Sequence, residues 1–232
     1  NWNDEMHTEF LMGNAAIARG AIAAGLNVVS GYPGTPSTEV LETTAKQNQD
    51  GSIYVEWSTN EKAAMELAAG AAYCGARTMV TMKQVGLNVA SDPLMSLAYI
   101  GVKGGMVVLV ADDPGPISSQ TEQDTRHFAA FSKLPCFDPS SVQEAYEMIQ
   151  EAFAYSEQYH TPVLFRPTTR VCHGYASISV KDVEEYHQNQ PEGFVKDSSK
   201  WVIFPKLSYQ NHIRMEARNE ELKQVFSEYC RN

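Results

Sequence analysis

The feature that most constrains the fold is an unbroken apolar run, Met106–Ala111, inside an alternating series of strand and helix patterns. An apolar run of this length between turn residues is typical of a strand buried on both faces. From residue 13 to about 166, strand patterns alternate with helix patterns and short connectors. This alternation indicates βαβ units, because each parallel strand needs a crossover to reach the next one. We therefore predict an α/β fold with a doubly wound, mainly parallel sheet and helices on both faces.

Two parts of the chain differ in composition. In the first part, helices are predicted at 14–24, 37–46, 59–73, 88–99, 120–131 and 142–153, and strands at 27–30, 53–57, 78–82, 106–111 and 162–165. Residues 181–232 contain 17 charged side chains in 52, against 20% for the whole chain, which is too polar for a second core. We expect an α/β domain over 10–178 and a charged linker plus helical extension over 179–232, leading toward a missing domain.

The extension carries one apolar stripe at helical spacing. Its members are Met215, Leu222, Val225, Phe226 and Tyr229. Such a stripe needs an apolar surface to cover it. It can pack back on the α/β domain or lead into a further domain, and the spacing alone does not separate these two possibilities.

Charge and cysteine spacing exclude several classes of protein. The net charge of −10 argues against nucleic acid and against anionic membranes as partners, and no apolar stretch approaches 18 residues. The four cysteines are far apart and show no metal-ligand spacing, so we expect idle thiols in a reducing, cytoplasmic compartment. The dinucleotide, P-loop, serine-hydrolase and zincin motifs are all absent.

The loop at residues 31–38 is rich in glycine and proline. Pro33 and Pro36 fix two φ angles and remove two backbone donors, while Gly31 and Gly34 allow close approach of the backbone. Such a loop presents Thr35 with little freedom, as a ligand-binding loop does. A plain turn from strand to helix, with Pro36 at the first helical position, explains the same residues equally well.

The predicted helix at 59–73 is built largely from alanine and glycine, so another element, a second subunit or a flat ligand packs close to it. Glu61 at its start would then lie where water is scarce, in a place suited to sharing a proton with a ligand nitrogen. Ser58 and Glu61 also match a capping box, in which Ser58 is the N-cap and Glu61 reaches back to it. Both roles for Glu61 stay open at this point.

Two further loops follow strands and reach the same edge of the predicted sheet. One contains Gln84 and Gly86, and the other covers residues 112–120. Open α/β sheets bind their ligands at the carboxyl ends of the strands. Asp112 and Asp113 have no third ligand at a recognisable spacing, so no metal site is predicted. Gln123, Asp124, Arg126 and His127 are expected to form a solvated helix face with local pairing.

The same residues carry a resemblance to a known family. The loop Tyr-Pro-Gly-Thr-Pro-Ser stands at 32–37 and Asn-Glu-Lys-Ala-Ala at 60–64, with Met-Lys-Gln-Val-Gly-Leu-Asn-Val at 82–89 and Ala-Asp-Asp-Pro-Gly at 111–115. Over residues 10 to 175 the chain resembles the pyrimidine-binding domain of the thiamine-diphosphate-dependent 2-oxoacid:ferredoxin oxidoreductases. Within that family it looks most like the α subunits of the indolepyruvate type.

The resemblance implies roles for individual residues. In the family, a glutamate hydrogen-bonds the aminopyrimidine ring of thiamine diphosphate and promotes deprotonation of the thiazolium ring. Carried over, Glu61 is the catalytic, cofactor-activating carboxylate. Thr35 and Gln84 are then substrate-binding, and the residues that border the cofactor are Tyr32, Pro33, Gly34 and Gly86. Relatives of the indolepyruvate type often have histidine at the position of Gln84, and the arginine of pyruvate-type enzymes near residues 112–113 is absent here.

The resemblance also implies what lies outside the chain. The whole enzyme would oxidatively decarboxylate aryl 2-oxoacids to acyl-CoA, with ferredoxin as acceptor, in anaerobic metabolism. No Gly-Asp dipeptide occurs here, so the diphosphate and Mg²⁺ are expected to be held by another domain, and this chain alone to be inactive. Iron–sulfur clusters, a ferredoxin-like domain, a β subunit and the coenzyme A site would also lie elsewhere, and a homodimer is expected. A non-catalytic assembly subunit, or a subunit of another 2-oxoacid decarboxylase, remains as an alternative.

Overall fold

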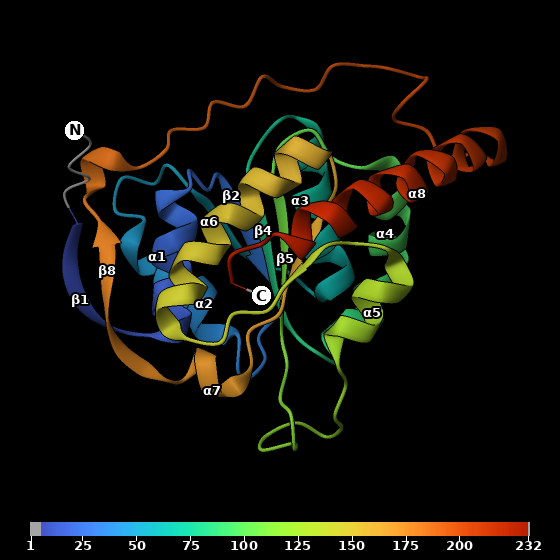
Figure 1. Ribbon diagram of the computed structural model, residues 1–232. Coiled ribbons are helices and arrows are strands. Elements are labelled where there is room, and N and C mark those ends of the chain that lie inside the picture. The colour runs from blue at the N-terminus through green and yellow to red at the C-terminus, as the bar shows by residue number, and fades with distance from the viewer. Residues whose placement is uncertain (1–5, 232) are drawn as a thin grey trace.

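The structure is a computed structural model that describes residues 6–231. In this part of the chain one sheet has six strands, in the order β3-β2-β4-β5-β7-β6, and every pairing within it is parallel (Figure 1). Its strands are β2 (Val28–Gly31), β3 (Tyr54–Trp57), β4 (Thr78–Lys83), β5 (Met106–Ala111), β6 (Cys136–Phe137) and β7 (Val163–Phe165). The predicted parallel sheet is confirmed, although the two-residue strand β6 was not anticipated.

Helices cover both faces of this sheet, as predicted for a doubly wound fold. One face packs against α1 (Gly13–Ala23), α2 (Thr38–Gln47) and α6 (Val142–Tyr159). The other face packs against α3 (Glu61–Tyr73), α4 (Gly86–Ile100), α5 (Thr125–Ser132) and the long α8 (Pro205–Ser227). The short helix α7 (Thr169–Cys172) follows β7.

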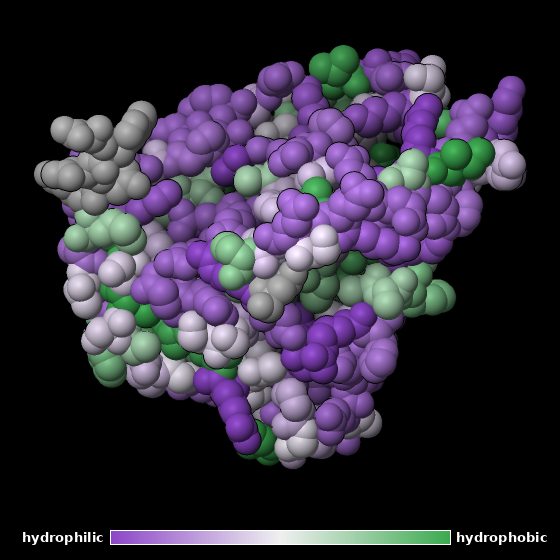
Figure 2. Space-filling model, in the orientation of Figure 1, coloured by the Kyte–Doolittle hydropathy of each residue, from purple (hydrophilic) through white to green (hydrophobic). Residues whose placement is uncertain are grey.

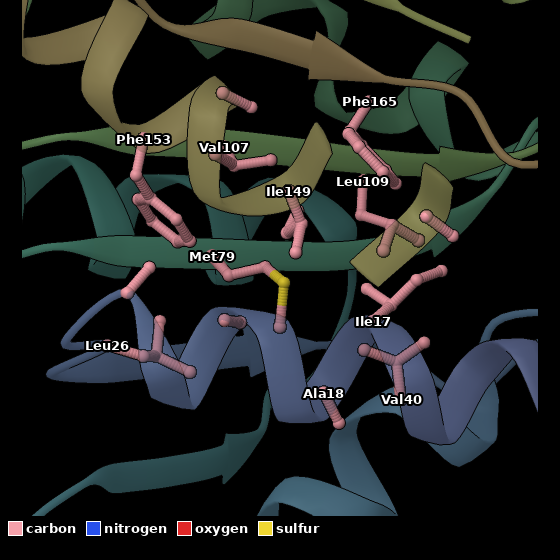
Figure 3. Packing of buried hydrophobic residues seen from close by; sticks show 14 of the residues in the cluster. Ile17, Ala18, Leu26, Val40, Met79, Val107, Leu109, Ile149, Phe153 and Phe165 are labelled. Atoms are coloured by element: carbon pink, nitrogen blue, oxygen red, sulfur yellow. The ribbon is translucent and has the colours of Figure 1, made fainter. Parts of the chain in front are cut away.

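The alternation of side chains along the central strands produces the two cores. On one side, Met79 of β4 and Val107 of β5 point toward Ile17 of α1 and Ile149 and Phe153 of α6 (Figure 3). On the other side, the neighbouring residues of the same strands pack against α3 and α4. All six residues of β5 are fully buried, which confirms that the apolar run is a strand covered on both faces.

A second, two-stranded sheet was not predicted. The strands β1 (Met6–Met12) and β8 (Tyr175–Lys181) pair antiparallel, with Met6 opposite Lys181 and Met12 opposite Tyr175. Ile178 and Val180 of β8 are buried against the residues Val142 and Tyr146 of α6. The expected division of the chain at residue 178 therefore falls inside β8.

The carboxyl-terminal extension packs back on the domain. After β8 and a 3-10 turn at Val183–Glu185, the chain crosses the molecule to α8, which returns toward α6 (Figure 1). Met215 and Leu222 are buried, and the ring of Phe226 stacks on Tyr155 at 5.4 Å between centroids. Tyr229 meets Phe137 edge to face at 5.6 Å. The apolar stripe thus packs back on the α/β domain, which is one of the two possibilities predicted from its spacing.

One predicted helix is wrong in its first half. The helix expected over 120–131 begins only at Thr125, because Asp124 is its N-cap and accepts a hydrogen bond from the amide of Arg126. Residues 120–124 instead belong to the loop that projects from the lower edge of the sheet (Figure 1).

The visible surface is mainly hydrophilic, with apolar residues in small patches (Figure 2). Within residues 6–231, no helix combines the length and the apolar character needed to cross a bilayer.

Candidate active site

Loops after three neighbouring strands meet at one edge of the sheet. β2 is followed by residues 32–37, β4 by residues 84–85, and β5 by the loop that runs to Asp124. Because the three strands are parallel and adjacent in the order β2-β4-β5, their carboxyl ends lie side by side. This is the edge at which open α/β sheets bind ligands.

Hydrogen bonds within the loop after β2 fix its shape. The carbonyl of Gly34 accepts from both the amide and the hydroxyl of Ser37, at 2.8 and 2.9 Å, and the amide of Gly34 donates to Oγ1 of Thr38 at 2.9 Å. The helix α2 begins at Thr38, two residues after Pro36, so Pro36 is not its first residue. The Thr35–Pro36 peptide bond is cis, and Thr35 is exposed at the tip of the loop together with Tyr32 and Pro33.

Asn14, which sequence reasoning missed, holds this loop from inside. It is the second residue of α1 and is fully buried. Its Nδ2 donates to the carbonyl of Pro36 at 2.6 Å and to Oε2 of Glu39 at 2.8 Å. An asparagine at the start of a helix built mainly from alanine and isoleucine was the available signal.

Glu61 is the first residue of α3, and its predicted capping role is wrong. The N-cap is Asn60, whose Oδ1 accepts from the amide of Ala63 at 2.9 Å. Ser58 lies outside the helix, and its hydroxyl donates to Oε1 of Glu56 at 3.0 Å. Among the described residues none forms a hydrogen bond with the Glu61 side chain. The carboxylate is therefore not engaged in capping its own helix.

The Glu61 carboxylate lies against the backbone of Gly86, the first residue of α4. Glu61 is 8% exposed, and a Cβ added at Gly86 would lie 2.6 Å from Oε1 and 2.9 Å from Cδ of Glu61. Only glycine leaves room for the carboxylate here. The buried carboxylate has free acceptor positions, and the backbone beside it carries no side chain. A flat ring with a nitrogen donor can form a hydrogen bond there, so these residues fit the pyrimidine end of thiamine diphosphate.

The small residues of α3 are explained by packing within the chain. Ala64, Ala68 and Ala72 are fully buried in the core shared with β4 and α4. The hydroxyl of Ser30 in β2 donates to the carbonyl of Ala64 at 2.7 Å. The composition predicted that another element packs close to this helix, and that element is the sheet.

Gln84 is buried directly after β4, with only 1% of its surface exposed. Its Nε2 donates to the carbonyl of Thr121 at 3.1 Å, while its Oε1 is buried without a hydrogen-bond partner among residues 6–231. Beside it, between α4 and α5, is a hollow of about 300 Å³ whose lining includes Leu87, Phe128 and Phe131. Gln84 is therefore tied to the loop after β5, and no contact joins it to Thr35.

The acidic residues after β5 are structural. Asp112 is fully buried, pairs with Nε of Arg166 at 2.6 Å and accepts from the amide of Thr125. Asp113 accepts three backbone N–H bonds from residues 117–119 and one from the hydroxyl of Thr169. Burial favours the neutral form of Asp113, but these hydrogen bonds outweigh burial and lower its pKa to about 2.

Neither aspartate is placed as a metal ligand. Within residues 6–231, no group of three or more His, Cys, Asp or Glu side chains is arranged to hold a metal ion. Asp124 and Arg126 pair locally at 2.7 Å and His127 is exposed, as predicted, but Gln123 and Asp124 precede α5 and are not part of a helix face.

The fold and this edge define an α/β cofactor-binding domain with a buried glutamate at its ligand-binding side. The family model described as "Pyruvate flavodoxin/ferredoxin oxidoreductase, thiamine diP-bdg" matches residues 19–228, and the chain belongs to this family. The resemblance inferred from the motifs is thereby confirmed.

Similar proteins include indolepyruvate oxidoreductase subunits. The IorA subunit of Methanothermobacter thermautotrophicus is 45% identical over 94% of this chain and 36% of its own length, and that of Pyrococcus horikoshii is 40% identical over 97% and 35%. The 2-oxoglutarate synthase subunit KorA of Methanocaldococcus jannaschii is 30% identical over 87% of this chain and 57% of its own. The chain thus spans about a third of the length of the IorA subunits.

A solved structure shares the fold. The 2-oxoglutarate:ferredoxin oxidoreductase from Magnetococcus marinus superposes with a TM-score of 0.77 over 96% of this chain and 46% of its own chain, at 17% sequence identity. At this identity the likeness supports the fold alone, and it agrees with the doubly wound sheet described above.

Proposed function

We propose that this chain is the pyrimidine-binding part of a thiamine-diphosphate-dependent enzyme that oxidatively decarboxylates aryl 2-oxoacids of the indolepyruvate type to acyl-CoA, with ferredoxin as electron acceptor. The observation that carries the proposal is the Glu61 carboxylate, buried against Gly86 and free of hydrogen bonds from the described residues. The names of the IorA relatives support the choice of an aryl substrate.

In this proposal Glu61 is the catalytic residue. Its carboxylate forms a hydrogen bond with a nitrogen of the pyrimidine ring and shares a proton there, and the Asn60 cap keeps it at the start of α3. Gly86 leaves the space in which that carboxylate lies. When bound, thiamine diphosphate supplies the electron sink for decarboxylation.

The loop after β2 would shape the substrate end of the site. Thr35 is exposed at its tip, where its hydroxyl can meet the carboxylate or carbonyl of the 2-oxoacid. Tyr32, Pro33 and Gly34 would border the cofactor ring, and Asn14 keeps the loop in place through Pro36. Gln84 would contact the substrate through its amide.

The remaining parts of the enzyme are proposed to lie outside this chain. They are the diphosphate and Mg²⁺ site, the iron–sulfur clusters with a ferredoxin-like domain, a β subunit, and the sites for ferredoxin and coenzyme A. The IorA relatives are about three times as long as this chain, which leaves room for such parts. A homodimer, a cytoplasmic location in anaerobic metabolism, and an α/β domain over 10–178 followed by a charged linker plus helical extension over 179–232 that leads toward a further domain complete the proposal.

Anaerobic assay of the full-length protein with its partner subunit tests this function. We expect reduction of ferredoxin with indolepyruvate that depends on both thiamine diphosphate and coenzyme A, with little activity on pyruvate. Release of an aryl aldehyde without ferredoxin reduction would point to a decarboxylase instead. Failure to turn over any aryl 2-oxoacid after reconstitution with the cofactor would refute the proposal.

A further inference from the structure

Lys83 is the last residue of β4 and lies at the ligand-binding edge of the sheet. Its aliphatic stem passes over Gly34 in the loop after β2. A Cβ added at Gly34 would lie 3.1 Å from both Cγ and Cδ of Lys83, tighter than an ordinary contact. Gly34 therefore makes room for the lysine stem, and the two strand ends β2 and β4 together fix where this lysine lies.

The ammonium group of Lys83 has no carboxylate partner among residues 6–231. Its recorded contact is Oε1 of Gln120, a neutral acceptor at 3.4 Å. Arg126 of α5 and Arg166, which follows β7, are already neutralised, because Arg126 pairs with Asp124 and Arg166 pairs with Asp112. Lys83 thus brings a positive charge to the site that no side chain of the described part balances.

A 2-oxoacid carries a carboxylate, and a cation on a fixed stem binds such a group through charge-assisted hydrogen bonds. We propose that Nζ of Lys83 binds the carboxylate of the 2-oxoacid substrate, between the loop that carries Gly34 and the buried Gln84. This inference rests on the function proposed above.

The chemistry predicts a specific kinetic effect. The substrate carboxylate leaves as carbon dioxide, so its ion pair with Lys83 is stronger before decarboxylation than in the transition state. Loss of the lysine charge therefore raises KM more than it lowers kcat. A hydrogen bond to a charged group is worth a factor of about 10 to 100 in binding.

The test uses the full-length enzyme with its partner subunit. We expect Lys83→Met to raise the KM for indolepyruvate about 10- to 100-fold, with the Kd for thiamine diphosphate unchanged and kcat changed little. Lys83→Arg keeps the charge and should restore most of the affinity. Lys62→Met is the matched control: Lys62 lies next to Glu61, pairs with Asp92 at 2.7 Å, and should leave KM unchanged.

Gly34→Ala provides a second variant that keeps the lysine. Its new Cβ pushes the stem of Lys83 aside by a few tenths of an ångström, so KM should rise, with the Kd for thiamine diphosphate unchanged, even where Lys83→Met fails to fold. An unchanged KM in both variants would overturn the proposal. A weaker Kd for thiamine diphosphate with an unchanged KM would also overturn it, because the bound anion would then be the cofactor diphosphate. If the wild-type enzyme binds no thiamine diphosphate and oxidises no aryl 2-oxoacid, the proposed function itself is wrong.

Discussion

The Glu61 carboxylate and the backbone of Gly86 are in direct contact, so that a Cβ at residue 86 would lie 2.6 Å from Oε1 of Glu61. The two residues are the first residues of α3 and α4, and they meet because β3, β2 and β4 are neighbours in the sheet. The Asn60 side chain caps α3, while β4 ends three residues before Gly86. The contact therefore positions the carboxylate, and within residues 6–231 no hydrogen bond occupies its oxygens.

Gly86→Ala tests this contact. The atoms that the new methyl group meets belong to the flexible end of the Glu61 side chain, so we expect the fold to remain and the carboxylate to move. A displacement of about 1 Å from a productive position costs on the order of 100-fold in rate. Activity of the full-length enzyme should fall by this order, while the melting temperature changes little.

Gly70→Ala is the matched control within α3. Nothing lies within 4 Å of a Cβ added at Gly70, and replacing a helical glycine by alanine stabilises a helix by about 0.5–1 kcal/mol. We expect a slightly raised melting temperature and unchanged activity. Full activity in Gly86→Ala would mean that the position of Glu61 does not matter.

The identity of the α3 cap leads to a prediction on stability. Asn60→Ala removes the side chain that accepts from the amide of Ala63 and should lower the free energy of unfolding by about 1 kcal/mol. Ser58→Ala removes a hydroxyl that lies outside the helix and donates to Glu56, and should cost less. Urea unfolding of the two variants checks this order. The reverse order would restore Ser58 as the cap.

The lowered pKa of Asp113 leads us to expect that the stability of the protein depends on pH. Its pKa in the folded protein is about 2, below the ordinary value of 3.8, so the ionised carboxylate stabilises the folded state. This contribution is present above about pH 4 and is lost as the pH falls toward 2. Asp113→Asn should lower the free energy of unfolding by about 1–3 kcal/mol at neutral pH. The difference from wild type should shrink between pH 4 and pH 2 in unfolding experiments, and a constant difference across that range would contradict the assignment.

The sequence predicted the parts of the fold that local periodicity controls. The run Met106–Ala111 is a strand with the predicted bounds, and the helix and strand order from α1 to β7 follows the pattern except for the unpredicted strand β6. The pair of β1 and β8 was missed because its partners are about 170 residues apart, with Met6 opposite Lys181. Pairing over such a distance leaves no local pattern in the sequence.

The sequence predicted which loops form the candidate site, but it did not predict the contacts between their residues. The motifs pointed to Glu61 and Gly86, but periodicity cannot show that the Glu61 carboxylate lies where a Cβ at residue 86 would be. The capping prediction chose Ser58 over Asn60 because both are good N-cap residues and the helix start shifts by two residues. The sequence did not single out Lys83, because its proposed role depends on its contact with Gly34, which lies in the loop after a different strand.

The most direct test of the central claim is the rate at which the full-length enzyme exchanges the C2 proton of bound thiamine diphosphate with deuterated solvent. The account predicts that Glu61→Gln slows this exchange by about 10²- to 10⁴-fold, the usual contribution of a positioned acid or base. Glu66→Gln, an exposed carboxylate on the same helix, should exchange at the wild-type rate. Exchange in Glu61→Gln at the wild-type rate, with the cofactor bound, would contradict the assignment of Glu61 as the activating carboxylate.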